Sequence, residues 1–396
     1  MRIAVAMSGG VDSSVAALLL AREGAEVIGV SMHLWDHDRE GTGAGEGRCC
    51  TLDDLRTARR AAEAIGVPHY TLDLREKFLD AVVRPFVASY LAGETPVPCL
   101  ACNTEVKFDA LFRKARALGC EAVATGHYAR LERDERTGEL RLLKARDAAK
   151  DQTYFLYELT PEQLAAARFP LGDLTKAEVR ELAREAGLPN WEKPDSQEIC
   201  FVSAEDGPAG FIRKEAASLG FALPSHPAAL PGDLVRADGT PLGAHPGTLG
   251  FTVGQRRGLG VAAGEPLYVV GIRVEDRQLV VGSGEELLSR VVFLRDVNLQ
   301  VPRAGTSYPV LSRIRSRHPD VPARLELPDG ESRRGGRARL VFEEPVRAAA
   351  PGQSAVFYDP DRPELLLGGG RIDRAVSPGG TGGETGAQGC AKGTTV

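Results

Sequence analysis

Short apolar runs alternate with stretches of helical periodicity along the first 130 residues of the chain. A short apolar run between turn residues predicts a buried strand, and apolar residues recurring every three to four positions predict an amphipathic helix. The expected strands are Arg2–Met7, Glu26–Met32, His69–Leu74 and Glu121–Thr125. The expected helices are Ser13–Glu23, Thr51–Ala64, Glu76–Leu91 and Val106–Leu118. This alternation predicts a parallel sheet with helices on both faces, a doubly wound α/β fold.

The composition and the predicted elements change after about Ser203, where Gly and Pro become frequent and short β-rich runs replace helices. Three runs predict a small β-rich central module: Leu234–Arg236, Pro266–Ile272 and Gln278–Val281. Five more predict a C-terminal β-barrel: Val310–Arg313, Ala323–Leu327, Arg337–Phe342, Gln353–Tyr358 and Glu364–Gly368. The expected boundaries are residues 1–202 for the α/β domain, 203–285 for the central module and 286–374 for the barrel. The Gly- and Thr-rich tail, residues 375–396, has almost nothing to bury and is expected to be disordered.

Composition places the chain among ordinary soluble proteins. Of its 396 residues, 43% are hydrophobic and 26% are charged. No apolar run approaches the roughly 18 residues of a membrane span. The N-terminus enters a glycine turn too early for a signal peptide, so a cytoplasmic location and no membrane partner are expected.

The net charge and the local charge distribution point to opposite conclusions about nucleic-acid binding. The net charge of −5, taken alone, argues against nucleic-acid binding. Binding to phosphates needs only a local basic face, however. One segment, Leu311–Arg337, carries seven arginines and four acidic residues. It fits either a nucleic-acid-binding surface or an ordinary solvated face.

The clearest chemical motif is Ser8-Gly-Gly-Val-Asp-Ser-Ser14, directly between the first expected strand and the first expected helix. Glycines let the backbone turn tightly and expose N–H groups, and a helix N-terminus adds partial positive charge. Such a loop fits a phosphate chain, and Asp12 is a candidate ligand for Mg²⁺. It is not a Walker A loop, because it lacks that motif's lysine. Its form resembles the pyrophosphate loop of enzymes that split ATP into AMP and pyrophosphate and attach AMP to a substrate oxygen.

Two strand ends are candidates to complete the nucleotide site, because ligands of open α/β sheets bind beyond the carboxyl ends of the strands. Met32 ends the second expected strand, and its backbone is a candidate contact for an adenine ring. Gly126, after a later strand, permits close approach of the backbone, and His127 is a candidate to face the substrate. A simple turn is the alternative interpretation of this Gly-His pair.

Seven cysteines occur in a long chain without a secretion signal, so thiol or catalytic roles are expected rather than a disulfide framework. Cys102 closes the motif that begins at Cys99, and a helix expected to begin near Asn103 would lower the pKa of its thiol. Cys200 ends the motif that begins at Asp195. Three interpretations stay open: a sulfur-relay pair of Cys102 and Cys200, a metal or iron–sulfur site that adds Cys99, and inert buried thiols. Core packing is expected for Cys120, and no role is assigned to Cys49, Cys50 and Cys390.

These motifs together resemble those of one known family, the bacterial tRNA-specific 2-thiouridylases. The resemblance runs from Met1 to about Arg374, in order and at fitting spacings. Its segments are Ala6–Ser14, Thr95–Asn103, Val106–Phe108, Ala124–Arg130, Lys150–Leu156, Phe169–Gly172, Asp195–Phe201, Gly247, Gly254–Gly260 and Pro351–Tyr358. It implies a pyrophosphate-loop ATPase domain followed by a small β-rich module and a C-terminal barrel.

The resemblance also implies a reaction, in which ATP adenylates the C2 oxygen of the wobble uridine in tRNAs for Lys, Glu and Gln, and sulfur then replaces that oxygen. Cys200 would carry the sulfur as a persulfide, received from a sulfur-relay protein or a cysteine desulfurase. Cys102 would be the partner nucleophile, so that the pair ends as a disulfide. Asp12 is the third implied catalytic residue, and Mg²⁺ would offset the charge of pyrophosphate. The implied ATP site consists of Ala6, Met7, Ser8, Gly9, Gly10, Val11, Asp12, Ser13, Met32 and Gly126.

The tRNA contacts implied by the resemblance are Val97, Pro98, Cys99, His127, Lys150, Asp151, Gln152, Arg315, Ser316 and Gln353. Three positions depart from the family's pattern, which often has asparagine at Val97, aspartate in some relatives at Cys99, and tyrosine at Ser316. The cysteine at position 99 keeps an iron–sulfur cluster on Cys99, Cys102 and Cys200 open. The alternative functions are a synthetase that adenylates a small molecule and a tRNA-binding protein with a decayed nucleotide loop.

Overall fold

The fold is described from a computed structural model of the chain, which covers residues 1–36, 52–195, 199–261, 264–328 and 334–376. The predictions that concern Cys49, Cys50, Thr51, Cys390 and the tail after Val376 lie outside the described residues. Within the described ranges, none of the helices combines the length and the apolar character needed to cross a bilayer.

A five-stranded parallel sheet, in the order β3-β2-β1-β4-β7, forms the centre of the N-terminal domain. Its strands are β1 (Arg2–Ala6), β2 (Glu26–His33), β3 (His69–Asp73), β4 (Ala122–Ala124) and β7 (Ala167–Arg168). The four strands expected from the sequence are confirmed. The fifth, β7, was missed because a two-residue strand leaves no periodic pattern.

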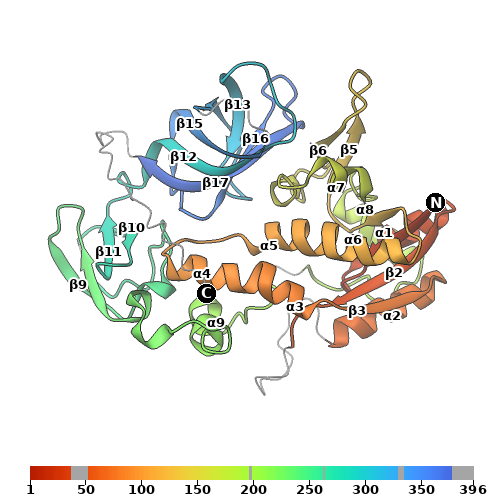
Figure 1. The fold of residues 1–396 in the computed structure, drawn as a ribbon, viewed down its shortest axis with the longest axis horizontal. Helices are drawn as coiled ribbons and strands as arrows, with labels where there is room; N and C mark the ends of the chain where they lie inside the picture. Colours follow the sequence, from red (N-terminus) through yellow and green to blue (C-terminus); the bar gives the residue numbers. More distant parts are fainter. Residues whose placement is uncertain (37–51, 196–198, 262–263, 329–333, 377–396) are drawn as a thin grey trace, which may run out of the picture.

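Helices cover both faces of this sheet, as predicted (Figure 1). Successive residues of β1 alternate between two apolar clusters: Ile3 and Val5 pack in one, Ala4 and Ala6 in the other. The first cluster includes side chains of α1 (Val11–Arg22), α2 (Leu52–Ile65) and α8 (Lys176–Glu185). The second includes α3 (Arg75–Phe78), η2 (Leu79–Val83), α4 (Arg84–Leu91), α5 (Pro98–Ala101), η3 (Cys102–Leu111), α6 (Phe112–Ala117) and α7 (Pro161–Ala166).

The helix that carries Cys102 begins five residues earlier than expected. It starts at Pro98 rather than near Asn103 and runs through α5, η3 and α6. Proline suits a first helical position, because the N–H that it lacks would have no intrahelical partner there. Cys102 therefore lies beyond the first turn, where the effect of the helix N-terminus on a thiol pKa has largely faded. The helix-end argument for Cys102 was wrong.

A four-stranded sheet, in the order β10-β11-β8-β9, forms the central module. Its strands are β8 (Gly232–Val235), β9 (Pro241–His245), β10 (Tyr268–Arg273) and β11 (Gln278–Gly282). One helix, α9 (Gly207–Glu215), and the short turns η5 (Leu223–Ser225), η6 (Pro227–Ala229) and η7 (Thr248–Gly250) precede or interrupt these strands. The change after Ser203 from helices to strands is therefore less abrupt than the sequence predicted.

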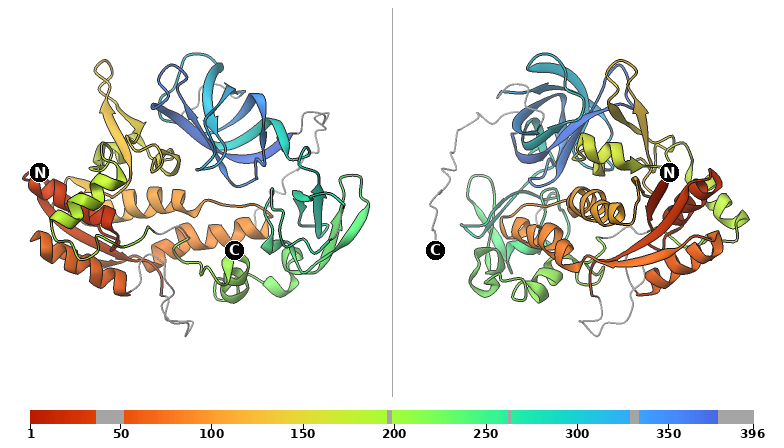
Figure 2. Two further views of the ribbon diagram at one scale, coloured as in Figure 1. Left: turned by 180° about the vertical axis from the view of Figure 1, so that it is seen from behind. Right: turned by 45° about the vertical axis from the view of Figure 1, so that its right-hand side comes forward.

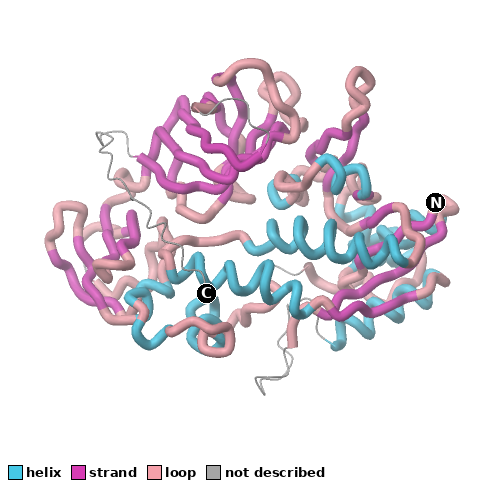
Figure 3. The backbone as a smooth tube through the Cα atoms, viewed as in Figure 1, coloured by secondary structure: helices cyan, strands magenta, loops and turns pink. Residues whose placement is uncertain are grey.

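A closed six-stranded barrel, in the order β12-β15-β14-β13-β16-β17, forms the C-terminal unit. Figure 3 shows its strands apart from the helices of the α/β domain. The strands are β12 (Leu288–Leu299), β13 (Ser307–Arg313), β14 (Val321–Glu326), β15 (Arg334–Arg347), β16 (Ser354–Tyr358) and β17 (Leu366–Val376). The five expected strands are confirmed as β13 to β17, and β12 was missed.

The barrel packs on the α/β domain through the segment that begins with η4 (Thr153–Phe155). The Tyr154 hydroxyl donates to the Ser354 carbonyl oxygen at 3.0 Å, and the Tyr157 carbonyl oxygen accepts from Asn298 Nδ2 at 2.5 Å. A Cβ at Gly369 would come within 2.6 Å of the Tyr157 ring, so glycine allows the ring to lie against β17. The buried tyrosines thus tie the two units together.

A second contact comes from the hairpin of β5 (Ala129–Arg133) and β6 (Leu140–Lys144), which stands beside the barrel in every view (Figure 1 and Figure 2). The Lys144 N–H donates to the Glu364 carbonyl oxygen at 2.8 Å, and Arg362 forms an ion pair with Glu132 at 2.6 Å. The hairpin and the tyrosine segment together fix where the barrel lies relative to the sheet.

Replacing Tyr154 should separate packing from hydrogen bonding at this contact. Tyr154→Ala removes a buried ring and should lower the free energy of unfolding by about 3–5 kcal/mol. Tyr154→Phe keeps the ring and should lose only about 0.5–1.5 kcal/mol. Urea denaturation measures both. Equal losses in the two variants would contradict the packing role of the ring.

Candidate functional site

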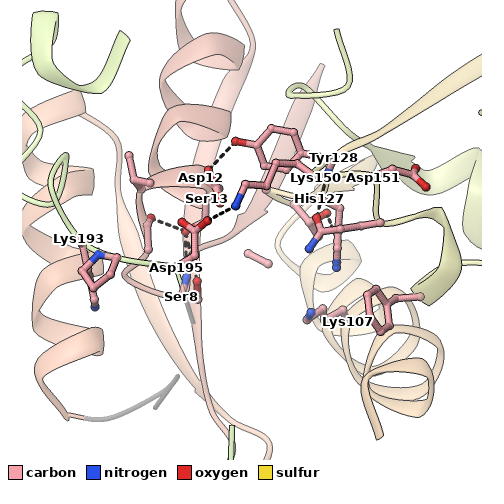
Figure 4. Close-up of a pocket in the computed structure, with 18 of the residues that line it drawn as sticks. Ser8, Asp12, Ser13, Lys107, His127, Tyr128, Lys150, Asp151, Lys193 and Asp195 are labelled. Atoms are coloured by element: carbon pink, nitrogen blue, oxygen red, sulfur yellow. Dashed lines mark hydrogen bonds and ion pairs between the residues drawn. The ribbon is translucent and has the colours of Figure 1, made fainter. Parts of the chain in front are cut away.

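A cavity of about 670 Å³ lies at the carboxyl ends of β1, β2 and β4. Residues from the start of α1 form one side, Met32 of β2 and Gly126 after β4 adjoin them, and Ser316 and Arg317 from the loop after β13 of the barrel lie at the edge. Figure 4 shows the labelled side chains that converge on it. Open α/β sheets bind ligands at this edge, which makes the cavity the candidate site.

The turn between β1 and α1, called here the phosphate loop (Ser8–Ser14), is held by its own side chains. Ser13 Oγ donates to the Gly10 carbonyl oxygen at 3.0 Å and accepts from the Ser8 N–H at 3.2 Å. Gly9 has a φ of +77°, and a Cβ there would lie 2.4 Å from the Asp54 carbonyl oxygen. Glycine is required at this position by backbone conformation and by space.

Gly126, two residues after the end of β4, lies in close contact with the phosphate loop. A Cβ at this position would lie 2.7 Å from the Ser13 amide nitrogen and 2.8 Å from the Asp12 carbonyl carbon. The turn after β4 and the start of α1 therefore meet in direct contact. No side chain fits between them.

Asp12 is held in place by two donors. The Tyr128 hydroxyl donates to Asp12 Oδ1 at 2.8 Å, and Lys176 Nζ lies 2.7 and 2.9 Å from the two carboxylate oxygens. Lys176 is the first residue of α8, which begins with a capping box of Thr175 and Glu178. Burial and then the Asp12 charge raise the pKa of Tyr128, so its hydroxyl remains a donor.

Asp195 links two lysines at the same side of the cavity. It forms ion pairs with Lys176 at 2.5 Å and with Lys150 at 2.6 Å. Burial tends to raise the pKa of Asp195, but the hydrogen bonds from these lysines outweigh it, and the pKa lies below its ordinary value. Asp195 is therefore a carboxylate at neutral pH.

A further lysine, Lys193, contacts the phosphate loop and α2. Lys193 pairs with Asp54 and donates to the Gly9 carbonyl oxygen at 3.3 Å. The buried Asn190 donates to the same oxygen at 3.0 Å and to Ser14 Oγ at 3.0 Å. These contacts hold the loop against α2.

The other side of the cavity carries Lys107 and His127. His127 Nδ1 and Thr125 Oγ1 are hydrogen-bonded at 2.7 Å, and the imidazole packs against the rings of Phe108 and Phe169. Burial, and then the charge of Lys107, lower the pKa of His127 well below its ordinary value. The imidazole is therefore neutral at physiological pH.

Most of the residues predicted to bind ATP share this cavity. Met7 is an exception, because it is buried beneath the loop with 1% of its surface exposed. Gly9 is the other, and its carbonyl oxygen faces Asn190 and Lys193. The predicted residues that line the cavity are Ala6, Ser8, Gly10, Val11, Asp12, Ser13, Met32 and Gly126.

The residues predicted to contact tRNA fall into two groups. His127, Lys150, Asp151, Gln152 and Ser316 line the cavity, and the exposed Arg315 adjoins Ser316. The others, Val97, Pro98, Cys99 and Gln353, are outside its lining. Gln353 Nε2 donates to the Thr95 carbonyl oxygen at 2.9 Å, two residues before Val97. Ser316 in the first group and Gln353 in the second both belong to the barrel, which therefore connects the two groups.

Cys102 and Cys200 pack in one apolar cluster, Cys102 with 8% of its surface exposed and Cys200 half-buried. Among the described residues that line the cavity there is no cysteine. Asp195, which does line it, precedes Cys200 by five residues, and five residues span at most about 18 Å. Cys200 therefore lies within that reach of the cavity edge. Cys120 is buried, as expected.

The described part of the chain contains no group of three His, Cys, Asp or Glu side chains arranged to hold a metal ion.

Comparison with known proteins agrees with this architecture. Residues 1–204 match the family described as tRNA methyl transferase HUP domain, residues 222–283 its PRC-barrel domain, and residues 289–372 the aminomethyltransferase beta-barrel domain. The chain is 48% identical to the tRNA-specific 2-thiouridylase MnmA of Solibacter usitatus, covering 94% of this chain and 99% of that protein. It is 47% identical to the protein of the same name from Geobacter metallireducens, covering 96% and 98%.

The chain belongs to the tRNA-specific 2-thiouridylase family. Among solved structures, it resembles an NMN synthetase from Francisella tularensis, which is 18% identical, with 48% of this chain and 64% of that chain covered and a TM-score of 0.29. The 2-thiouridylase relationship spans all three units of the fold.

Several residues of this 2-thiouridylase site were not foreseen from the sequence. Lys107, Tyr128 and Asp195 lay inside recognised motifs but had no assigned role. Lys176 carried a usable signal, because it directly follows Thr175, which opens the Thr-x-x-Glu capping box of α8. Asn190, Lys193 and Asp54 carried none, since their roles depend on how distant segments pack.

Gly126→Ala should displace the phosphate loop, because the new Cβ would overlap the backbone of Asp12 and Ser13. We expect the affinity for ATP, measured by calorimetry, to fall at least tenfold, which corresponds to about 1.4 kcal/mol. The control is Gly250→Ala, where the added Cβ would meet only Ala209 at 3.9 Å. Unchanged ATP affinity in Gly126→Ala would contradict the close contact.

His127 should make stability depend on pH. An unfolded histidine takes up a proton near about pH 6.5, whereas folded His127 stays neutral to lower pH. The unfolded state then binds more protons, so the free energy of unfolding falls as the pH drops below about 6.5, by up to about 1.4 kcal/mol per pH unit.

Urea denaturation of the wild type and His127→Gln across this range measures the effect. Burial also lowers the pKa values of His69 and His318, but both residues are common to the two proteins and cancel in the difference. The variant should show the shallower pH dependence. Parallel curves would contradict a neutral His127.

Proposed function

We propose that this protein is an ATP-dependent tRNA-uridine 2-sulfurtransferase, which converts the wobble uridine of tRNAs for Lys, Glu and Gln into 2-thiouridine. The observation that carries the proposal is one cavity that combines the phosphate loop with Lys150–Gln152 and the barrel residues Ser316 and Arg317. A small-molecule synthetase would not need the barrel at the edge of its nucleotide site. The relatives named tRNA-specific 2-thiouridylase support the same substrate.

Adenylation is the first proposed step. The C2 oxygen of the uracil attacks the α-phosphorus of ATP, and a P–O bond forms. The bond from that phosphorus to the bridging oxygen breaks, and its electron pair leaves with pyrophosphate. The N3 proton of the uracil passes to water. The phosphate loop and the positive end of α1 hold the β- and γ-phosphates.

Asp12 is the proposed ligand of Mg²⁺. Magnesium usually binds one or two carboxylates together with substrate phosphates, and Asp12 supplies one carboxylate at the start of α1. Bound there, the ion would offset the charge of the departing pyrophosphate. Lys176, which now contacts both oxygens of Asp12, would share in that task.

Sulfur transfer is the second proposed step. The terminal sulfur of a persulfide on Cys200 attacks C2, and the C2–O bond breaks with its electrons leaving on AMP. The Cys102 thiolate then attacks the inner sulfur of Cys200, and the S–S electrons pass to the sulfur on C2. The products are 2-thiouridine and a Cys102–Cys200 disulfide, which a cellular thiol must reduce before the next turnover.

The remaining assignments follow from this reaction. The persulfide would come from a sulfur-relay protein or a cysteine desulfurase, and the reaction would take place in the cytoplasm. The uracil would enter near Val97, Pro98 and Cys99, with Arg315 and Gln353 on the tRNA side. We also propose that the catalytic unit ends near residue 202 and the central module near residue 285. The alternative to the persulfide is an iron–sulfur cluster on Cys99, Cys102 and Cys200, which would require these three residues to come closer together than in the described structure.

The decisive variant is Cys200→Ser. It should form no 2-thiouridine, because the sulfur carrier is gone, yet retain tRNA-dependent exchange of pyrophosphate with ATP. Nucleoside mass analysis of tRNA transcripts incubated with ATP, a cysteine desulfurase and cysteine as the persulfide source measures the first activity. It also separates thiolation from the methylation that the HUP-domain description names.

Two control variants belong to this experiment. Asp12→Ala should lose both activities, and Cys120→Ala, at a core cysteine away from the cavity, should keep both. Thiolation by Cys200→Ser would refute the sulfur assignment. Exchange that needs no tRNA would favour a small-molecule synthetase.

A further inference from the structure

Lys107 lies on the side of the cavity opposite the lysine that supports the phosphate loop. Figure 4 shows Lys107 below His127, across the cavity from Lys193, with Ser8, Asp12 and Ser13 between them. A nucleotide whose outer phosphates occupy the loop would therefore have Lys107 on its far side.

The charges around the cavity single out this residue. Each lining carboxylate already has a cationic partner: Asp12 with Lys176, Asp54 with Lys193, Asp151 with Arg313 and Asp195 with Lys150. Of the three lysines that line the cavity, Lys150 and Lys193 are used in these pairs. Within the described residues, Lys107 has a hydrogen bond only to the uncharged Asn103 amide oxygen, at 2.9 Å. The cavity thus keeps a positive charge at Lys107.

This charge is held in a fixed position. Asn103 is 1% exposed, and its amide nitrogen donates to the Phe155 carbonyl oxygen at 2.8 Å, so its oxygen points to Lys107. Both residues belong to the π-helical segment η3, which begins at Cys102. In a π-helix residues five apart are joined by the backbone hydrogen bond, so Lys107 lies about one turn from Cys102. Segments wound this way are often found at functional sites.

We propose that Lys107 is a catalytic residue of the adenylation step, whose ammonium group binds the α-phosphate and stabilises the negative charge that develops there. This inference rests on the proposed function. The phosphate loop holds the part of the nucleotide that leaves, whereas Lys107 acts on the phosphorus that is attacked. The loop has no lysine of its own, and the opposite side of the cavity supplies this one.

The chemistry fits the position. As the C2 oxygen of the uracil bonds to the α-phosphorus, the non-bridging oxygens of that phosphorus gain negative charge until pyrophosphate departs with the electron pair of the broken bond. A fixed cation at those oxygens stabilises the transition state more than the ground state. Lys107 keeps its proton throughout, and Asn103 is the positioning residue that aims it.

The test is tRNA-dependent exchange of pyrophosphate with ATP, which reports adenylation without sulfur transfer. Lys107→Met should lower the turnover number of this exchange about 10²–10³-fold, the usual effect of losing one preorganised donor. The dissociation constant for ATP should change less than about tenfold, because the outer phosphates remain held by the loop. Lys107→Arg should recover part of the rate, since it restores the charge in another shape.

Three controls keep the result interpretable. Lys114→Met, on the exposed side of α6, should retain wild-type exchange. If Lys107→Met does not fold, as judged by its circular dichroism spectrum, Lys107→Arg and Lys107→Gln carry the same comparison. Cys120→Ala, at a buried core cysteine outside the cavity lining, should also retain wild-type exchange.

Several outcomes would overturn the inference. Normal exchange with lost thiolation in Lys107→Met would place the lysine in the cysteine step, beside Cys102. A raised KM for tRNA with unchanged turnover would make it a tRNA phosphate contact. No change at all would remove it from the site. If the wild type itself shows no tRNA-dependent exchange, the proposed function fails instead, and the two failures are distinct.

Discussion

The contact of two glycines with neighbouring backbone is the constraint on which the rest of this site depends. Gly126 lies against Asp12 and Ser13, and Gly9 lies against Asp54, each closer than any side chain would allow. These contacts set where α1 begins and therefore where its positive end points. The ion pairs of Asp12 and Asp54 can form only because the backbone has already brought α8 and α2 to the loop.

The barrel is coupled to this constraint through a short polar segment. Arg313 of β13 pairs with Asp151 at 3.2 Å, and the next residue, Gln152, exchanges two hydrogen bonds of 2.9 Å with the Tyr128 backbone. Tyr128 in turn holds Asp12. Burial raises the pKa of Asp151 even though Arg313 opposes it, which indicates how deeply this carboxylate is enclosed. A tRNA that moved the barrel would thus act on a chain of contacts that ends at the nucleotide site.

Local patterns predicted the fold well, and long-range packing explains what they missed. The strands β1 to β4 and the cap at Thr175 are specified by neighbouring residues, so periodicity and capping rules suffice. β7 is too short for any pattern. The start of the Cys102 helix was expected near Asn103, although Pro98 suits a first helical position and is where the helix begins.

The same distinction applies to the site. The phosphate loop was predictable because seven consecutive residues carry its chemistry. Lys193 and Asn190 support it from more than 170 positions away, as shown by their bonds to Gly9 and Ser14. No sequence rule joins residues so far apart, and only the fold assigns them.

The distribution of charge has a consequence for how the site works. In the described structure the carboxylates and most lysines of the cavity neutralise one another, and a buried pair costs less than either ion alone. A polyphosphate would compete with Asp12 and Asp195 for Lys176 and Lys150, so part of its binding energy must replace existing ion pairs. Lys107, in contrast, loses only a hydrogen bond to an uncharged amide when it binds an anion. Its interaction with the charge that develops in the transition state therefore does not have to replace an ion pair. These ion pairs thus limit the affinity for ATP in its ground state. Lys107, the cation proposed to bind the attacked phosphate, forms no ion pair with a carboxylate in the described residues.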